Sequence, residues 1–123
     1  MLNAYVLVAL GGALGATARY GVNQIVVAIF DKPLVWATLL VNVVGCFFMG
    51  LVYSWLQSRP DISATLKPLL MVGFLGALTT WSAFSMETVL LIQNDEWLRA
   101  LAYTLLTCIF CFTAFWLGLC LKN

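Results

Sequence analysis

The sequence predicts an all-α membrane protein, a single domain over residues 1–123 with four transmembrane helices, assembled as an antiparallel dual-topology homodimer. Of the 123 residues, 63% are hydrophobic and only 9% are charged, whereas about 25% are charged in an ordinary soluble domain. The apolar residues form four long runs, and the few Lys and Arg residues are divided almost evenly between the two sides that these runs define. The composition and the runs predict the membrane fold, and the even division predicts the two orientations.

The composition also excludes several classes of function. A net charge of +1 excludes a basic nucleic-acid-binding module, so no nucleic acid partner is expected. The chain has no His and no glycine-rich nucleotide loop, and no nucleophile-base pair or carboxylate dyad can be assembled. We therefore expect a multi-pass protein of the cell's inner (plasma) membrane that contacts the lipid bilayer and is not an enzyme.

The first two apolar runs are each near the roughly 20 residues that cross a bilayer core. The first helix is expected over about residues 4–30, because Asp31-Lys32-Pro33 follows it. The second is expected over about residues 34–57, before the helix-breaking segment Arg59-Pro60-Asp61.

The third and fourth runs complete the bundle. The third helix is expected over about residues 69–92, and the polar segment 93–96 separates it from the fourth. Trp97 is placed as an interfacial anchor at the start of the fourth helix, which reaches Leu121. Four crossings put both termini on the same side of the membrane.

The distribution of positive charge gives almost no preference for one orientation. With the termini inside, the cytoplasmic segments carry three basic residues and the outer segments two, with Arg19 near the end of the first helix. The five loop residues are Arg59, Lys67 and Lys122 inside, and Lys32 and Arg99 outside. A chain without this bias can insert both ways, and two opposed copies would form an antiparallel twofold dimer.

Small residues that allow helices to approach closely occur in the first two runs. They are Gly11 and Gly15, with Gly12 and Ala16 one residue along, and then Gly45 and Gly50. Such spacing indicates helix packing without identifying the partner helix.

Two glycines and four hydroxyl residues interrupt the third run between Gly73 and Ser85. Counting about 1.5 Å per residue from Leu69, residues 76–80 lie roughly 10–17 Å deep, near the middle of a core about 30 Å thick. A helix broken near the midplane would free backbone carbonyls to line water or bind a cation. In the alternative, the helix is continuous, its glycines serve packing and its hydroxyls bond to the preceding turn.

Three motifs resemble those of the Fluc (CrcB) fluoride channels. The segment Gly-Ala-Leu-Thr-Thr-Trp-Ser-Ala-Phe over residues 76–84 is similar to that family's Gly-x-Leu-Thr-Thr-Phe-Ser-x-Phe signature. Residues 41–45, which include Asn42, and residues 12–20, which end in Arg19-Tyr20, are similar to its patterns in the second and first helices. The motifs lie in order on three helices, and the resemblance covers the whole chain.

The resemblance implies a passive channel that exports fluoride. It implies an antiparallel homodimer with two pores and a structural Na+ at the dimer centre. The implied Na+ ligands are the main-chain carbonyls of Gly76 and Thr79 from both subunits. Hard oxygen ligands freed by a helix break suit a hard cation.

An apolar pore must replace the water of fluoride with hydrogen-bond donors or positive dipoles. Asn42 offers an amide N–H, and Phe84 offers the positive edge of its ring. Trp81 shares the helical face of Phe84 and stands where the family has Phe, which adds an N–H donor and bulk. For both rings, ordinary packing against lipid or protein is the alternative.

Further polar residues extend this set of pore candidates. On the fourth helix, Tyr103, Thr107 and Cys111 recur at every fourth position, so they lie along one face. In the family, a Tyr followed by hydroxyl residues tracks the pore there. Ser82 and Thr80 are candidates whose alternative is bonding to their own helix backbone.

Two charged residues of the runs remain open. Arg19 either snorkels to the interface or forms an electropositive vestibule for anions. Glu87, about 27 Å past Leu69, is expected at an interface, where it serves a vestibule or a gate or has no role.

Two other functions compete with the channel. A proton-coupled exporter of the small multidrug-resistance kind has a similar size and dual topology, but it needs a deep carboxylate. The first helix has no acidic residue, and the expected shallow position of Glu87 also counts against an exporter. An accessory subunit of a larger membrane complex would need no transport site.

Overall fold

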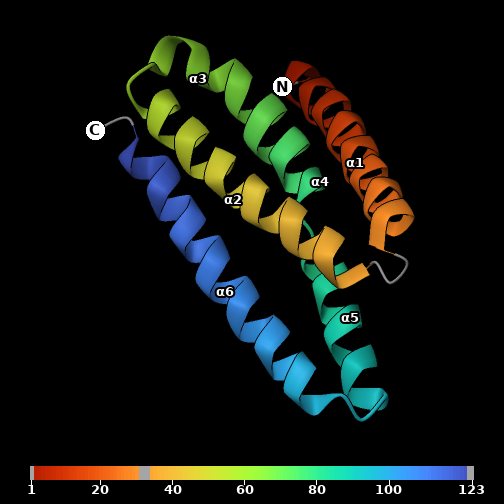
Figure 1. Cartoon of the computed structure of the whole chain (residues 1–123). Coiled ribbons are helices and arrows are strands. Elements are labelled where there is room, and N and C mark those ends of the chain that lie inside the picture. Colours follow the sequence, from red (N-terminus) through yellow and green to blue (C-terminus); the bar gives the residue numbers. More distant parts are fainter. Residues whose placement is uncertain (1, 31–33, 122–123) are drawn as a thin grey trace.

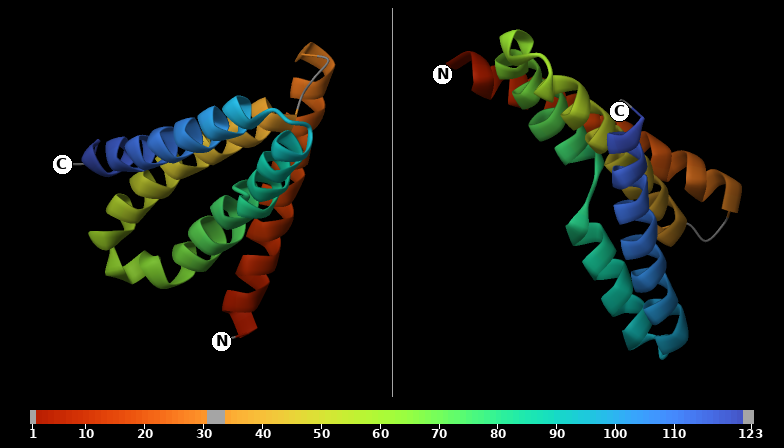
Figure 2. Two further views of the ribbon diagram at one scale, coloured as in Figure 1. Left: turned by 90° about the horizontal axis from the view of Figure 1, so that it is seen from below. Right: turned by 90° about the vertical axis from the view of Figure 1, so that its left-hand side faces the viewer.

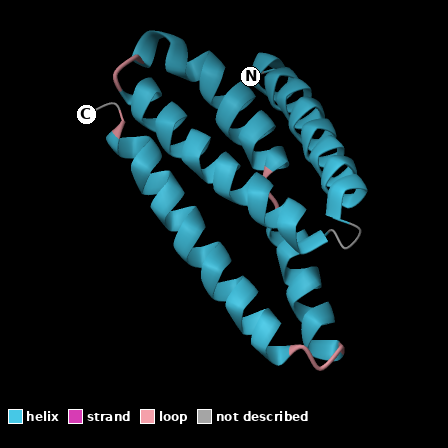
Figure 3. Cartoon of the chain, viewed as in Figure 1, coloured by secondary structure: helices cyan, strands magenta, loops and turns pink. Residues whose placement is uncertain are grey.

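A computed structural model describes residues 2–30 and 34–121 of the chain. Throughout these residues the secondary structure is helical, with short connecting segments (Figure 3). Four helical spans are long and apolar enough to cross a membrane, over residues 3–30, 35–57, 60–93 and 97–120. The predicted all-α membrane fold with four spans is confirmed.

The first two helices and the last one lie close to their predicted bounds. Helix α1 covers Leu2–Phe30, α2 covers Leu34–Gln57 and α6 covers Trp97–Cys120. The predicted stop at Asp31-Lys32-Pro33 and the basic residue Lys122 lie outside the described residues. Helices α1 and α2 run in opposite directions, and α1 begins at the same end of the bundle at which α6 ends (Figure 1).

The predicted start of the third span, near Leu69, is wrong because the helical chain begins nine residues earlier. It consists of α3 (Pro60–Leu66), the π-helical η1 (Lys67–Leu75), α4 (Gly76–Leu78) and α5 (Trp81–Gln93). Pro60 begins α3 instead of ending a helix, since the first helical position needs no N–H donor. Pro68 then lies at the start of η1, where the wider turns of a π-helix accommodate a residue that cannot donate.

The helices pack as two parallel pairs. Helix α2 lies along α6, and α1 lies along η1 and α4, whereas α1 and α2, although consecutive, contact each other much less (Figures 1 and 2). Helix α5 leaves the α1 side of the bundle and packs against α6 and α2. The third span therefore changes neighbours between α4 and α5.

Glycines allow both pairs to approach at backbone distance. A Cβ atom on Gly11 would lie 2.1 Å from the Leu69 carbonyl oxygen, and one on Gly15 would lie 2.1 Å from that of Phe74. Between α2 and α6, a Cβ on Gly118 would lie 2.1 Å from the Phe47 carbonyl oxygen. The small residues predicted to serve packing thus contact helices of the same chain.

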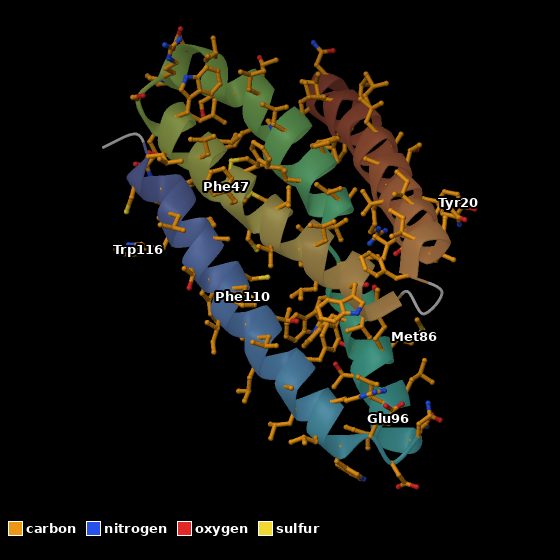
Figure 4. The ribbon with its side chains drawn as sticks, viewed as in Figure 1. Tyr20, Phe47, Met86, Glu96, Phe110 and Trp116 are labelled. Atoms are coloured by element: carbon orange, nitrogen blue, oxygen red, sulfur yellow. The ribbon has the colours of Figure 1, made fainter. Side chains whose placement is uncertain are left out.

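Large apolar side chains cover the outer surface. The side chains of Tyr20 on α1 and Trp116 on α6 point away from the bundle (Figure 4) and are 65% and 68% exposed. A small core of Val41, Leu75 and Leu78 lies where α2 meets the third span. This distribution is typical of a protein whose solvent is hydrocarbon.

Replacing Gly118 by Ala should lower the thermal unfolding midpoint in detergent, because the new methyl group would overlap the α2 backbone. Forcing α2 and α6 apart costs about 1–3 kcal/mol. Gly21→Ala is the matched control, since nothing lies within 4 Å of a Cβ at that position and Ala favours helix by about 1 kcal/mol. Equal midpoints for the two variants would contradict the close approach of α2 and α6.

Candidate functional site

The backbone is extended at two residues between α4 and α5. Thr79 has φ −78° and ψ 156°, and Thr80 has φ −151° and ψ 119°. Both residues belong to the segment whose glycines and hydroxyls indicated a site. The side chain of Thr79 faces α2, where a Cβ on Gly45 would lie 2.3 Å from the Thr79 methyl carbon.

Asn42 on α2 pairs with both main-chain groups of Thr80. The Thr80 N–H donates to Asn42 Oδ1 at 2.7 Å, and Asn42 Nδ2 donates to the Thr80 carbonyl at 3.1 Å. Both residues are buried. A single amide side chain therefore satisfies both main-chain groups of Thr80, which have no helical partners.

The Thr80 hydroxyl caps α5. Its oxygen accepts from the Ala83 N–H at 3.2 Å and lies 3.3 Å from the Ser82 hydroxyl. Extended dihedrals and this bond make Thr80 an N-cap residue, which explains why α5 starts at Trp81. For Thr80 the expected alternative, a bond to its own helix, is thus the arrangement seen. Ser82 itself is exposed.

Three predicted aromatic residues lie in contact at the start of α5 and on α6. The Phe84 ring centroid lies 5.0 Å from that of Trp81 and 5.2 Å from that of Tyr103. Phe84 is only 4% exposed, whereas Trp81 is 74% exposed in the single chain. The structure thus brings Phe84, Trp81 and Tyr103 together, with the Phe84 ring between the other two.

The expectation of a solvated Glu87 carboxylate is wrong. Its side chain is 3% exposed, and its two carboxylate oxygens accept hydrogen bonds from Thr38 at 2.6 Å and from Tyr103 at 2.7 Å. Counting along one helix did not account for α2 and α6, which cover this part of α5. Two hydroxyl donors partly replace the water that the carboxylate loses on burial.

Thr107 lies one turn after Tyr103 on α6 and is 5% exposed. Its Oγ1 is buried and has no hydrogen-bond partner among the residues that the structure describes. Several other hydroxyls of the bundle bond back to their own helix; Thr104, for example, donates to the Ala100 carbonyl at 2.9 Å. An unpaired buried hydroxyl is unusual and calls for a ligand or water.

A cavity of about 540 Å³ lies beside the break. The side chains of Arg19, Asn23 and Ser82 contribute to its polar lining, together with two threonines of the site, Thr38 and Thr80. Arg19 therefore faces the same space as the capped start of α5. From the sequence, Arg19 was expected either at the membrane interface or at a vestibule for anions, and in the structure it lines this cavity.

Four buried polar residues lie one after another from α2 through α5 to α6, and we call them the polar row: Thr38, Glu87, Tyr103 and Thr107. Thr38 both lines the cavity and bonds Glu87, so the row begins at the cavity and ends at Thr107. The sequence interpretation missed Thr38, although it lies one helical turn before Asn42 and shares its face. It named Glu87 without recognising the burial.

The remaining site prediction concerned Gly76 and Thr79 as cation ligands. Gly76 is exposed in the single chain, and Thr79 is half-buried. The Thr79 hydroxyl donates to the Leu75 carbonyl at 3.0 Å. No group of three acidic or Cys side chains that could hold a metal ion occurs within residues 2–30 and 34–121.

Comparison with known proteins gives one consistent result. Residues 6–119 match the model of a family described as CrcB-like protein, Camphor Resistance (CrcB). A protein of Shewanella putrefaciens named fluoride-specific ion channel FluC is 46% identical over 112 residues, which is 91% of this chain and 90% of the relative. Proteins of the same name from Shewanella baltica and Magnetococcus marinus are 44% identical over 117 residues and 46% identical over 112 residues. These alignments cover 95% and 91% of this chain, and 94% and 91% of the relatives.

Replacing Tyr103 by Phe should destabilise the protein, because one Glu87 oxygen loses its donor. Hydrogen bonds to charged groups contribute about 1.5–3 kcal/mol, and the unfolding midpoint in detergent measures the loss. Tyr5→Phe on the 75% exposed Tyr5 is the control and should leave the midpoint unchanged. A Tyr103→Phe variant as stable as this control would mean that the hydrogen bond to Glu87 does not hold the site together.

Proposed function

The chain belongs to the CrcB family, and on that basis we propose that this multi-pass membrane protein is a passive channel that exports fluoride, not an enzyme. The observation that carries the proposal is the polar row, which leads from the cavity beside Arg19 to the unpartnered hydroxyl of Thr107. Relatives that align over nine-tenths of this chain are named as fluoride-specific channels. A plasma-membrane location follows from this transport role.

A small anion in an apolar bundle needs donors along its whole path. Fluoride holds its water tightly, and an unpaired charge in a low-dielectric interior costs many kcal/mol. The Thr107 hydroxyl is not committed to any described acceptor, so it is available to donate to the ion. We assign Thr107 as a point where fluoride regains a lost hydrogen bond.

The Phe84 ring supplies a second kind of contact. It is buried between Trp81 and Tyr103, and the edge of an aromatic ring carries positive charge that attracts an anion. Trp81 adds an indole N–H at a position where the family signature has Phe. We therefore assign both rings to the pore, with Ser82 and Thr80 at its cavity end.

Asn42 has one donor left for the ion. Its Nδ2 carries two hydrogens, and only one is needed for the bond to the Thr80 carbonyl. The cavity beside the break is lined by Arg19 and by Thr80, the residue that Asn42 bonds, and the Arg19 charge draws anions into it. We assign Arg19 to the entrance of the proposed path and Asn42 to a position next to it.

Glu87 controls access to the donors of the polar row. The hydroxyl hydrogens of Thr38 and Tyr103 both point at its carboxylate. Fluoride must therefore compete with a bound carboxylate for the Tyr103 hydroxyl, and displacement of Glu87 opens the path. This is the gating role among the three that the sequence left open.

We further propose that two copies assemble as an antiparallel, dual-topology homodimer with two pores. The balanced Lys and Arg count supports both orientations. One chain leaves Trp81, Ser82 and Gly76 exposed beside the break, although the first two are assigned to the path. A second copy over this surface would enclose them.

The same surface fits the implied Na+. Residues 76–79 form the broken turn, and the first and last of its carbonyls, those of Gly76 and Thr79, would accept from Thr80 and Ala83 in a continuous helix. Those two N–H groups are instead bonded to Asn42 Oδ1 and Thr80 Oγ1. Two neutral carbonyls from each subunit would supply hard oxygen ligands for a structural cation near the membrane midplane.

The burial of Glu87 gives the multidrug-exporter alternative one favourable observation, since such an exporter needs an enclosed carboxylate. The family membership favours the channel.

A channel moves fluoride without a proton gradient, whereas a proton-coupled exporter needs one. Fluoride efflux from liposomes with equal internal and external pH, followed by a fluoride electrode, separates the two functions.

In that assay, Thr107→Val should sharply reduce fluoride efflux while the protein remains folded. The substitution removes the unpaired hydroxyl and keeps the shape, so the unfolding midpoint should stay the same or rise. Thr104→Val is the matched control, since Thr104 bonds its own helix, and it should conduct like the parent. Parental efflux from Thr107→Val would remove Thr107 from the path, and no efflux from the parent would reject the channel.

Removal of Na+ should destabilise the dimer. A cation that binds only the assembled state stabilises it by mass action, by about 2.7 kcal/mol at one hundred times its dissociation constant. The measurement is the unfolding midpoint in Na+ buffer and in N-methylglucamine buffer of equal ionic strength, with the dimer monitored by size-exclusion chromatography. A midpoint that does not respond to Na+ would reject the structural ion and leave the fluoride path standing.

A further inference from the structure

We infer that the side chains of Asn42 and Thr80 act as positioning residues for a cation: they occupy the two N–H groups that would otherwise close the helix over the carbonyls of Gly76 and Thr79. This role differs from a contact with fluoride. It rests on the proposed cation site, and it explains why these two carbonyls are available.

The Gly76 carbonyl oxygen would accept from the Thr80 N–H in an unbroken helix. That N–H donates instead to Asn42 Oδ1 at 2.7 Å, the shorter of the two bonds between Asn42 and Thr80. Because Asn42 is 8% exposed, water does not compete strongly for its side chain. Asn42 thus takes the donor that Gly76 would use.

The Thr79 carbonyl oxygen would accept from the Ala83 N–H in an unbroken helix. The Thr80 hydroxyl oxygen accepts from that N–H at 3.2 Å. The Thr80 side chain therefore forms the N-cap of α5, directly after Thr79, the C-cap of α4. Thr80 takes the donor that Thr79 would use.

The side chain of Thr79 is held by its own helix and by α2. Its hydroxyl donates to the Leu75 carbonyl at 3.0 Å, and its methyl carbon lies against Gly45 on α2. The main-chain oxygen of Thr79, whose helical donor is bonded to Thr80 Oγ1, is the group that we assign to the cation. This oxygen and the carbonyl of Gly76 are neutral, which favours a hard cation of low charge.

The test uses the full-length dimer in fluoride-free detergent and measures the Na+ concentration at half-maximal thermal stabilisation, with N-methylglucamine holding the ionic strength constant. Asn42→Leu and Thr80→Val remove the two competing acceptors. Each should weaken Na+ binding about three- to tenfold, the equivalent of one regained backbone hydrogen bond.

Conservative variants separate positioning from contact with fluoride. Thr80→Ser keeps the capping oxygen, so it should retain the parental Na+ response. Asn42→Asp keeps an acceptor for the Thr80 N–H and should also retain it, although its added negative charge should suppress fluoride efflux. Thr88→Val is the control on α5, since Thr88 bonds the Phe84 carbonyl of its own helix and lies away from the break.

Weaker Na+ binding in Thr80→Val with its recovery in Thr80→Ser supports the inference, even if Asn42→Leu fails to form a dimer. A parental Na+ midpoint in Thr80→Val, and in Asn42→Leu where it forms a dimer, overturns it. A parent that shows no Na+ response also overturns it, together with the cation site. Fluoride efflux by that same parent would then show that the channel function stands independently.

Discussion

The constraint on which this structure depends is that a membrane interior offers no water to a backbone N–H or C=O group. Within the third apolar span the backbone is extended at Thr79 and Thr80, and main-chain groups there lose their helical partners. The paired hydrogen bonds between Asn42 and Thr80 satisfy both groups of Thr80. They require α2 to lie against the break, and the contact of Gly45 with the Thr79 methyl group shows how closely it does so.

From this contact the rest of the arrangement follows. Because the third span is interrupted at Thr79 and Thr80, its two parts need not share an axis, and each has its own neighbours: η1 and α4 pack on α1, and α5 packs on α6 and α2 (Figure 2). The change of direction places Phe84 and Glu87 against Tyr103 of α6. Thr38, one turn from Asn42, then reaches Glu87 from α2. A single backbone interruption thus joins an aromatic cluster, a buried carboxylate and a polar cavity.

Much of the fold could be predicted because apolar length is a local property. The bounds of the second helix were correct to the residue, whereas the third span began nine residues early, since Pro60 is equally compatible with ending a helix and with starting one. The grouping of Phe84 with Trp81 follows from helical spacing. Tyr103 was named as a pore residue through family resemblance, and its contact with the Phe84 ring was not predicted. The burial of Glu87 and the bonds of Asn42 could not be predicted, because both depend on how α2 and α6 cover α5. Depth counted along one helix says nothing of its neighbours.

The pairing of the helices also bears on how the chain is made. The extensive contacts join the first span to the third and the second to the fourth, each in parallel (Figure 1). Consecutive spans have far smaller contacts. A ribosome delivers the spans in order, so the first hairpin enters the bilayer before either of its helices has a main neighbour. Insertion and packing are therefore separate events for the first two spans: the main contacts of the first helix form only after the third span has left the ribosome, and those of the second only after the fourth.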